Sequence, residues 1–248
     1  MNYISTRGLF KKAWATVKAH FGKIVGAATI IFLVQILLDA QTYMDDTSPM
    51  TVGMGIFAII GSIISLIIGV AVTSALIRIG RGAPVNTQVF AITSSQVLRY
   101  VGVVVLIGLI MIGFVIPVVG IGFALGVTSF VGNMSGPIMV VAALLFAAVI
   151  VLVYINIRLM FASYFVVDGK TGVIDAIKQS WYITKGEVWT IVKLGILSLG
   201  VGLLGLLALG VGILVAIPVI AFAYVYLYIE LTDRKGKVHQ STDTKVNE

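Results

Sequence analysis

Residues 101–157 contain no Lys, Arg, Asp or Glu, and this stretch most limits what the chain can fold into. Soluble domains carry about 25% charged residues, so a run of this length is not typical of them. Across all 248 residues, 11% are charged and 59% hydrophobic, and the mean hydropathy is +1.11. The sequence therefore predicts a polytopic membrane protein, and it excludes an ordinary soluble enzyme, a disordered chain and a fibrous repeat.

Six membrane crossings fit the apolar segments. A spanning helix needs about 20 mostly apolar residues to cross roughly 30 Å of hydrocarbon. The uncharged run is too long for one helix, and turn residues at 128–137 divide it into two. The last apolar stretch, 194–229, is either one very long helix or two helices around Gly210 and Gly212. We expect crossings near residues 22–39, 53–77, 101–127, 137–160, 190–209 and 212–231.

The basic residues favour two helices in that last stretch, because cytoplasmic loops near helix ends are rich in Lys and Arg. With six crossings, all 17 basic residues fall on one side, whereas with five the basic tail would lie outside. We therefore expect an all-α bundle of six transmembrane helices in the cell (plasma) membrane, with both termini in the cytoplasm. Residues 1–232 are expected to form a single transmembrane domain, and residues 233–248 a disordered cytoplasmic tail.

The net charge of +7 has a sufficient explanation in this topology. Basic residues orient the chain and face anionic lipid headgroups, so the bilayer is the expected partner. A protein partner or a homo-oligomer stays possible. Nucleic acid is not expected, because no basic soluble domain is present to bind it.

Two polar segments have the spacing of helices that lie in the membrane interface, at residues 7–21 and 172–185. Their expected apolar stripes are Leu9, Phe10, Ala13, Trp14, Val17 and Phe21, and Val173, Ile174, Ile177, Trp181 and Thr184. Thr171 is the expected N-cap of the second helix and Gly186 its expected stop. A weaker helix is predicted at residues 86–100. Trp14, Trp181 and Trp189 are the predicted interfacial anchors.

The two segments also align without gaps. Both have the pattern Lys-x-x-Trp-x-x-x-Lys-x-x-x-x-x-Ile-Val, beginning at Lys11 and at Lys178. The middle segment fits the pattern loosely, with Phe90 at the tryptophan position and Val101 at the final valine. The chain therefore reads as three repeats, each an interfacial helix followed by a membrane hairpin. The alternative is that Trp and Lys collect at membrane interfaces without any repeat.

Residues 158–192 read RLMFASYFVVDGKTGVIDAIKQSWYITKGEVWTIV. This segment resembles the signature of a prokaryotic group of six-helix membrane proteins. The group includes the membrane domain of some glycerophosphoryl diester phosphodiesterases and several families of unknown function. The matching positions are Arg158, Asp168, Gly172, Ala176, Ser180, Trp181, Thr184, Lys185, Gly186 and Trp189. The resemblance implies the six-helix fold. It does not imply hydrolysis, because no soluble catalytic domain follows Glu230.

Arg158 is expected near the cytoplasmic end of the fourth crossing, where an arginine is costly unless it is paired or reaches the interface. Asp168 and Glu230 are its candidate partners. A candidate cytoplasmic-side polar cluster therefore comprises Arg158, Asp168, Lys178, Lys185 and Glu230. It is a folding and anchoring motif, or a vestibule for an anionic solute or lipid headgroup, or a coupling-ion site at Glu230.

The sequence contains no recognisable catalytic motif. With no Cys and only two His, neither a metal site nor a cofactor site is predicted. Pro117 and Pro218 should kink or interrupt their helices. The favoured function is a non-enzymatic integral membrane protein that scaffolds, regulates or protects the cell envelope. The alternatives are a small permease or channel subunit for an anionic solute or lipid headgroup, and an enzyme acting on lipid headgroups.

Overall fold

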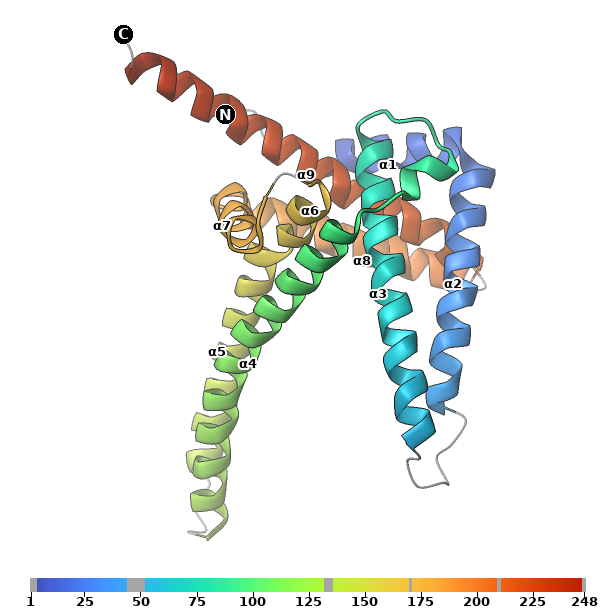
Figure 1. The fold of residues 1–248 in the computed structure, drawn as a ribbon. Coiled ribbons are helices and arrows are strands. Elements are labelled where there is room, and N and C mark those ends of the chain that lie inside the picture. Colours follow the sequence, from blue (N-terminus) through green and yellow to red (C-terminus); the bar gives the residue numbers. More distant parts are fainter. Residues whose placement is uncertain (1–3, 44–51, 132–135, 170, 209–210, 247–248) are drawn as a thin grey trace. The chain divides into compact units, whose positions relative to one another are not determined.

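The computed structural model describes residues 4–43, 52–131, 136–169, 171–208 and 211–246, and within these ranges the chain is helical without strands (Figure 1). The elements are α1 (Thr6–Ala19), α2 (Phe21–Tyr43), α3 (Val52–Gly80), the 3₁₀ helix η1 (Thr87–Phe90), α4 (Ser94–Val131), α5 (Gly136–Leu159), α6 (Ala162–Val167), α7 (Val173–Ile183), α8 (Val188–Leu207) and α9 (Val211–Val246).

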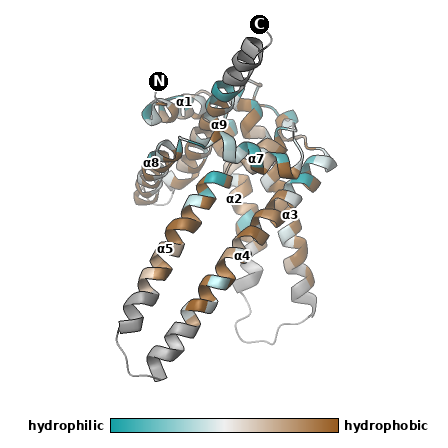
Figure 2. Ribbon diagram, turned by 90° about the vertical axis from the view of Figure 1, so that its left-hand side faces the viewer, coloured by the Kyte–Doolittle hydropathy of each residue, from teal (hydrophilic) through white to brown (hydrophobic). Residues whose placement is uncertain are grey.

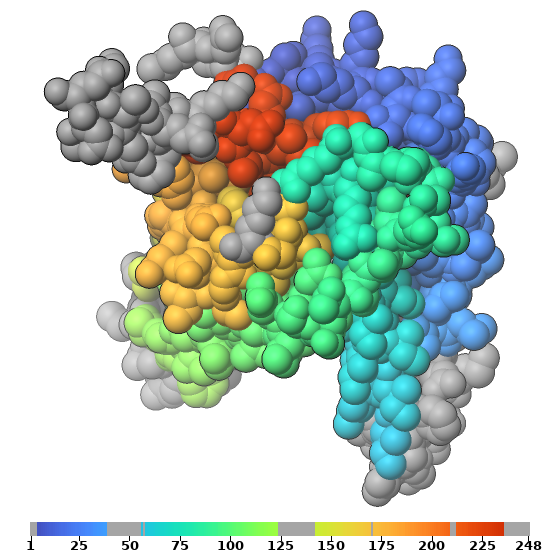
Figure 3. Space-filling view, turned by 45° about the horizontal axis from the view of Figure 1, so that its top comes forward, coloured from blue at the N-terminus to red at the C-terminus, as the bar shows by residue number. Residues whose placement is uncertain are grey.

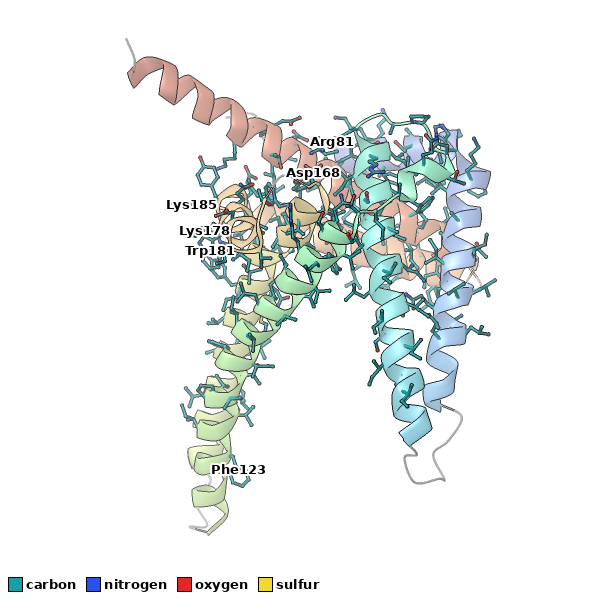
Figure 4. The ribbon with its side chains drawn as sticks, viewed as in Figure 1. Arg81, Phe123, Asp168, Lys178, Trp181 and Lys185 are labelled. Atoms are coloured by element: carbon teal, nitrogen blue, oxygen red, sulfur yellow. The ribbon has the colours of Figure 1, made fainter. Side chains whose placement is uncertain are left out.

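Within the described residues, six helices are long and apolar enough to cross a membrane: α2, α3, α4, α5, α8 and α9. The predicted all-α fold with six candidate spans is therefore confirmed. Large apolar side chains point outward along these helices, as Phe123 of α4 does with 73% of its surface exposed (Figure 4). The apolar character of α4 and α5 is visible in Figure 2. Water would oppose such exposure, whereas lipid accepts it, so this is a multi-pass membrane protein.

The chain forms two compact units. Unit 1 contains residues 1–97 and 189–248, and unit 2 contains residues 98–188. The N-terminal and C-terminal segments of the sequence thus pack together, and the middle segment packs on itself.

Unit 1 is built around α9, which packs against α1, α2 and α3. Figure 3 shows the N-terminal helix in blue lying against α9 in red. The hydroxyls of Thr16 and Tyr226 share a hydrogen bond of 2.7 Å between α1 and α9. Gly80 brings the end of α3 against α9, because a Cβ there would lie 2.8 Å from Val225. Phe222 and Tyr228 of α9 are fully buried.

The face by which α1 packs corrects the sequence interpretation. Leu9, Ala13 and Val17 are buried and α1 packs on α9, so this side of the helix faces protein rather than the acyl region of the membrane. Trp14 and Phe21, which were placed on the same stripe, are exposed. Side chains smaller than an aromatic ring allow two helices to approach closely. The residues of α1 that face α9 are therefore the smaller ones of the stripe, and its large aromatic residues lie outside the contact.

The last apolar stretch forms two helices, since α8 ends at Leu207 and α9 begins at Val211. Two glycines allow their close approach. A Cβ on Gly212 would lie 2.7 Å from the carbonyl oxygen of Gly205, and a Cβ on Gly205 would lie 2.9 Å from Ala216. Any larger residue at either position must push the two helices apart.

In unit 2, α7 packs against α5 and α6. Its first residue, Val173, also contacts α4, because a Cβ on Gly102 would lie 2.8 Å from it. The mostly apolar residues 159–167 do not all continue α5. The helix α5 ends at Leu159, and the chain continues as α6, whose Phe165 and Val166 are buried.

Residues 86–100 are not one helix. The Asn86 side chain accepts from the Gln88 N–H and starts η1, which ends at Phe90. A new helix, α4, then begins at Ser94, with the Gln96 side chain accepting the Thr93 N–H at 2.9 Å. Residues 86–100 were predicted as one helix, and the two N-terminal caps divide them into two.

The other boundaries differ from expectation in three places. The turn at 128–137 is shorter, since α4 runs to Val131 and α5 begins at Gly136, with 132–135 outside the described residues. Both Pro117 and Pro218 lie inside continuous helices, so neither proline interrupts its helix. In the segment 233–248, which was expected to be a disordered tail, α9 continues to Val246.

Candidate functional site

The signature segment forms a joint between the end of α5 and α7, which we call the Arg158 joint: Tyr154, Arg158, Ser180, Trp181 and Thr184. The last four carbonyls of a helix have no partner within it. The Ser180 hydroxyl donates to one of them, the main-chain oxygen of Arg158, at 2.8 Å. The Thr184 hydroxyl, just after α7, donates at 2.7 Å to the main-chain carbonyl of Ser180 and lies 3.5 Å from the Arg158 oxygen. The Ser180 hydroxyl of α7 thus caps the C-terminus of α5.

The Arg158 side chain is held by aromatic rings. Its guanidinium carbon lies 4.4 Å from the centre of the Trp181 ring and 5.9 Å from that of Tyr154. These two rings meet edge-to-face with centroids 6.2 Å apart. An arginine over an aromatic face gains electrostatic attraction from the ring, more so when desolvated. Arg158 is only 3% exposed, so desolvation applies.

The remaining signature positions shape α7. Ala176, Ser180 and Thr184 are fully buried, whereas Ile174 and Trp181 are exposed. The buried face of α7 therefore differs from the apolar stripe predicted for residues 172–185. Between membrane helices, small residues face the neighbouring helix, and large apolar residues face lipid.

The two ends of α7 differ in how well they were predicted. The N-cap is Gly172, without a side-chain cap, so the expected role of Thr171 is wrong. Gly186 has φ = 84°, the left-handed conformation that favours glycine, in the turn between α7 and α8.

The members of the predicted polar cluster have the following surroundings in the structure. Among the described residues, the Arg158 guanidinium contacts the rings of Trp181 and Tyr154, and its Nε makes no hydrogen bond. Lys178 and Lys185 lie exposed on α7 and in the turn after it (Figure 4). Glu230 belongs to unit 1 and pairs with Arg234, one turn later on α9, at 2.7 Å.

The three predicted anchors are all exposed tryptophans. Trp14, Trp181 and Trp189 have 48%, 41% and 68% of their surface accessible. Exposed indoles beside lysines are typical of membrane interfaces. Trp181 has a second role that the sequence did not indicate, since one face of its ring covers Arg158.

Polar residues inside the spans also join helices. The Ser65 hydroxyl of α3 donates to the Gln35 side chain of α2 at 2.9 Å. The side-chain amide of Asn156 in α5 donates at 3.2 Å to the main-chain carbonyl of Leu152 in the same helix. Its nitrogen also lies 3.7 Å from the sulfur of Met111 in α4. Gln35 and Asn156 are polar residues in otherwise apolar runs of the sequence. Their partners come from helix pairing, which hydropathy does not encode. In the described part of the chain, no three His, Asp or Glu side chains gather as metal ligands do.

Comparison with known proteins adds a family. No curated protein and no solved structure matches the chain. A family model described as a domain of unknown function, DUF7847, matches residues 7–240, which is nearly the whole sequence. The matched residues include the Arg158 joint and most of both units. The chain therefore belongs to the DUF7847 family.

Proposed function

We propose that this chain is a non-enzymatic integral membrane protein that scaffolds, regulates or protects the cell envelope, alone, as a homo-oligomer or with a protein partner. One observation carries the proposal: polar side chains in and near the spans are used to hold helices together. The Ser180 hydroxyl caps α5, Gln35 joins α2 to α3, and Thr16 joins α1 to α9. Groups used in this way stabilise an architecture instead of acting on a substrate.

The proposal includes a topology in the cell membrane with both termini in the cytoplasm. In it, α1 and α7 lie at the headgroup level of the cytoplasmic leaflet, and their exposed tryptophans reach the interface. The exposed side chains of Lys11, Lys12 and Lys178 support this, because such lysines attract anionic headgroups. Nucleic acid has no part in the proposed function.

We also propose kinship with the prokaryotic six-helix group that includes the membrane domain of glycerophosphoryl diester phosphodiesterases. The support is the signature at residues 158–192. The Arg158 joint gives these positions a structural purpose, the connection of α5 to α7. Since that purpose requires no chemistry, no hydrolytic activity is carried over with the kinship.

A permease or channel subunit for an anionic solute or lipid headgroup is the second candidate. It is favoured by Pro218, which lies within α9. A proline has no N–H, so the Leu214 carbonyl loses its partner one turn earlier, and transporters use such carbonyls to contact solutes.

Flux through proteoliposomes distinguishes the two functions. The purified chain is reconstituted and the vesicles are assayed for uptake of radiolabelled inorganic phosphate and for scrambling of fluorescent phosphatidylglycerol. A scaffold leaves both rates at the level of protein-free vesicles. A rate above that level, lowered by Lys178→Gln with Lys185→Gln and unchanged by Lys11→Gln with Lys12→Gln, would replace the scaffold with a permease. Release of glycerol phosphate from a glycerophosphodiester would instead make it an enzyme.

A further inference from the structure

Unit 1 contains a cavity of about 240 Å³ between three of its spans. Its walls come from α2, α3 and α9, with η1 and the residue Val85 closing one side. The lining is almost wholly carbon. Phe32 and Ile217 line the cavity and are also exposed, so the cavity reaches the surface of the unit that faces lipid.

Small side chains produce this space. Four alanines, Ala27, Ala28, Ala75 and Ala221, line it where larger residues would fill the gap between helices. Protein interiors normally pack without such voids, because each missing contact loses dispersion energy. An apolar space of this size, open to a bilayer, is filled by hydrocarbon.

The two ends of the cavity differ in polarity. Lys23, in the first turn of α2, lies at one end. Gln35 lies at the other end, and its side-chain oxygen already accepts from Ser65. The two residues are twelve positions apart on one helix, which spans about 18 Å at 1.5 Å per residue. One leaflet contributes about 15 Å of hydrocarbon, half of roughly 30 Å. The cavity therefore runs the depth of one leaflet, from headgroup level to the midplane.

The Lys23 ammonium is available to a ligand. The side chain is exposed, and its one described hydrogen bond, to the Val85 carbonyl, is 3.4 Å long. That length exceeds the usual range for an N–H donor, and an ammonium has three protons to donate. A phosphate at headgroup depth would meet a charged donor there.

We propose that this cavity is a binding site for one anionic phospholipid of the bilayer, with an acyl chain between α2, α3 and α9 and its phosphate on Lys23. The length of the apolar channel selects an acyl chain, and Lys23, the cation among the described residues that line it, selects a negative charge. The lipid would complete the packing of unit 1 around α9 and so goes beyond the scaffold role proposed above.

The test uses the full chain in nanodiscs of equal phosphatidylglycerol and phosphatidylcholine. After transfer to detergent, native mass spectrometry counts the lipids that remain bound. The wild type should retain one phosphatidylglycerol in preference to phosphatidylcholine. Ala28→Trp fills the cavity and should abolish retention, whereas Ala58→Trp, an exposed alanine of α3 outside the cavity, should retain lipid as the wild type does.

Lys23→Gln tests the charge separately, and because the side chain is exposed it leaves the fold intact. It should lower the ratio of retained phosphatidylglycerol to phosphatidylcholine about fivefold, while Lys12→Gln on α1 should not change it. Equal retention by the wild type and Ala28→Trp overturns the site and leaves only annular lipid. An unchanged ratio in Lys23→Gln overturns the assignment of the phosphate, even if Ala28→Trp fails to fold.

Discussion

The Ser180 hydroxyl and the main-chain carbonyl of Arg158 lie 2.8 Å apart, and this hydrogen bond fastens α7 to the last turn of α5. The two residues are 22 positions apart in sequence. Both are buried, so the carbonyl has little access to water if the hydroxyl is removed.

Ser180→Ala should therefore lower the free energy of unfolding by about 1–3 kcal/mol, the cost of a buried carbonyl without its donor. Thermal unfolding in detergent measures the loss, and limited proteolysis before α7 should become faster. Ser62→Ala is the matched control, because Ser62 is exposed and donates only to Ala58 of its own helix. Equal stability of the two variants would contradict the capping role.

Trp181→Leu should destabilise unit 2 by about 0.5–2 kcal/mol, because the guanidinium of Arg158 loses the ring that covers it. A double-mutant cycle with Arg158→Met isolates the stacking energy from the loss of each side chain. Trp189→Leu removes another exposed indole and serves as the control. If the losses of unfolding free energy in Trp181→Leu and Arg158→Met simply add in the double variant, the stacking contributes nothing.

Tyr226→Phe removes one hydroxyl and retains the ring that lies 6.3 Å from Phe222. The hydrogen bond to Thr16 is lost, so α1 should separate from α9 more often, at a cost of about 1 kcal/mol. Protease cleavage within α1 reports the separation. Thr16→Val should have a similar effect and should add little in the double variant, whereas independent effects would show that the hydroxyls do not act together.

Gly212→Val should destabilise the contact between α8 and α9 by about 1–3 kcal/mol, because its side chain would meet the Gly205 backbone. Gly200→Val, on the same hairpin, has open space at the Cβ position and should cost only its lower helix propensity. The difference between their unfolding temperatures checks the close approach. Equal temperatures would show that the helices separate without cost.

The proposed topology can be tested with single cysteines, since the chain has none of its own. Cysteines at positions 48 and 134 should react with an impermeant maleimide added outside intact cells. Cysteines at positions 88, 179 and 240 should react only after the membrane is opened. Labelling of position 240 from outside would exclude six crossings with both termini in the cytoplasm.

Hydropathy predicts the spans of this protein well, because one physical requirement, length in hydrocarbon, decides them. It predicts the faces of α1 and α7 poorly. In α1 half of the predicted stripe, Leu9, Ala13 and Val17, is buried, whereas Trp14 is exposed. In α7 the small residue Ala176 is buried and Trp181 is exposed. The partners of Arg158 could not be predicted from charge, since its contacts are a serine hydroxyl on its carbonyl and an aromatic ring.

The packing of α1 on α9 has a consequence for biosynthesis. Thr16 and Tyr226 are separated by 210 residues, so the N-terminal helix emerges from the ribosome long before its neighbour is translated. Until α9 is made, Leu9, Ala13 and Val17 lack the helix against which α1 packs in the complete unit. Packing of unit 1 therefore cannot be completed before Val211 and the residues after it have been translated.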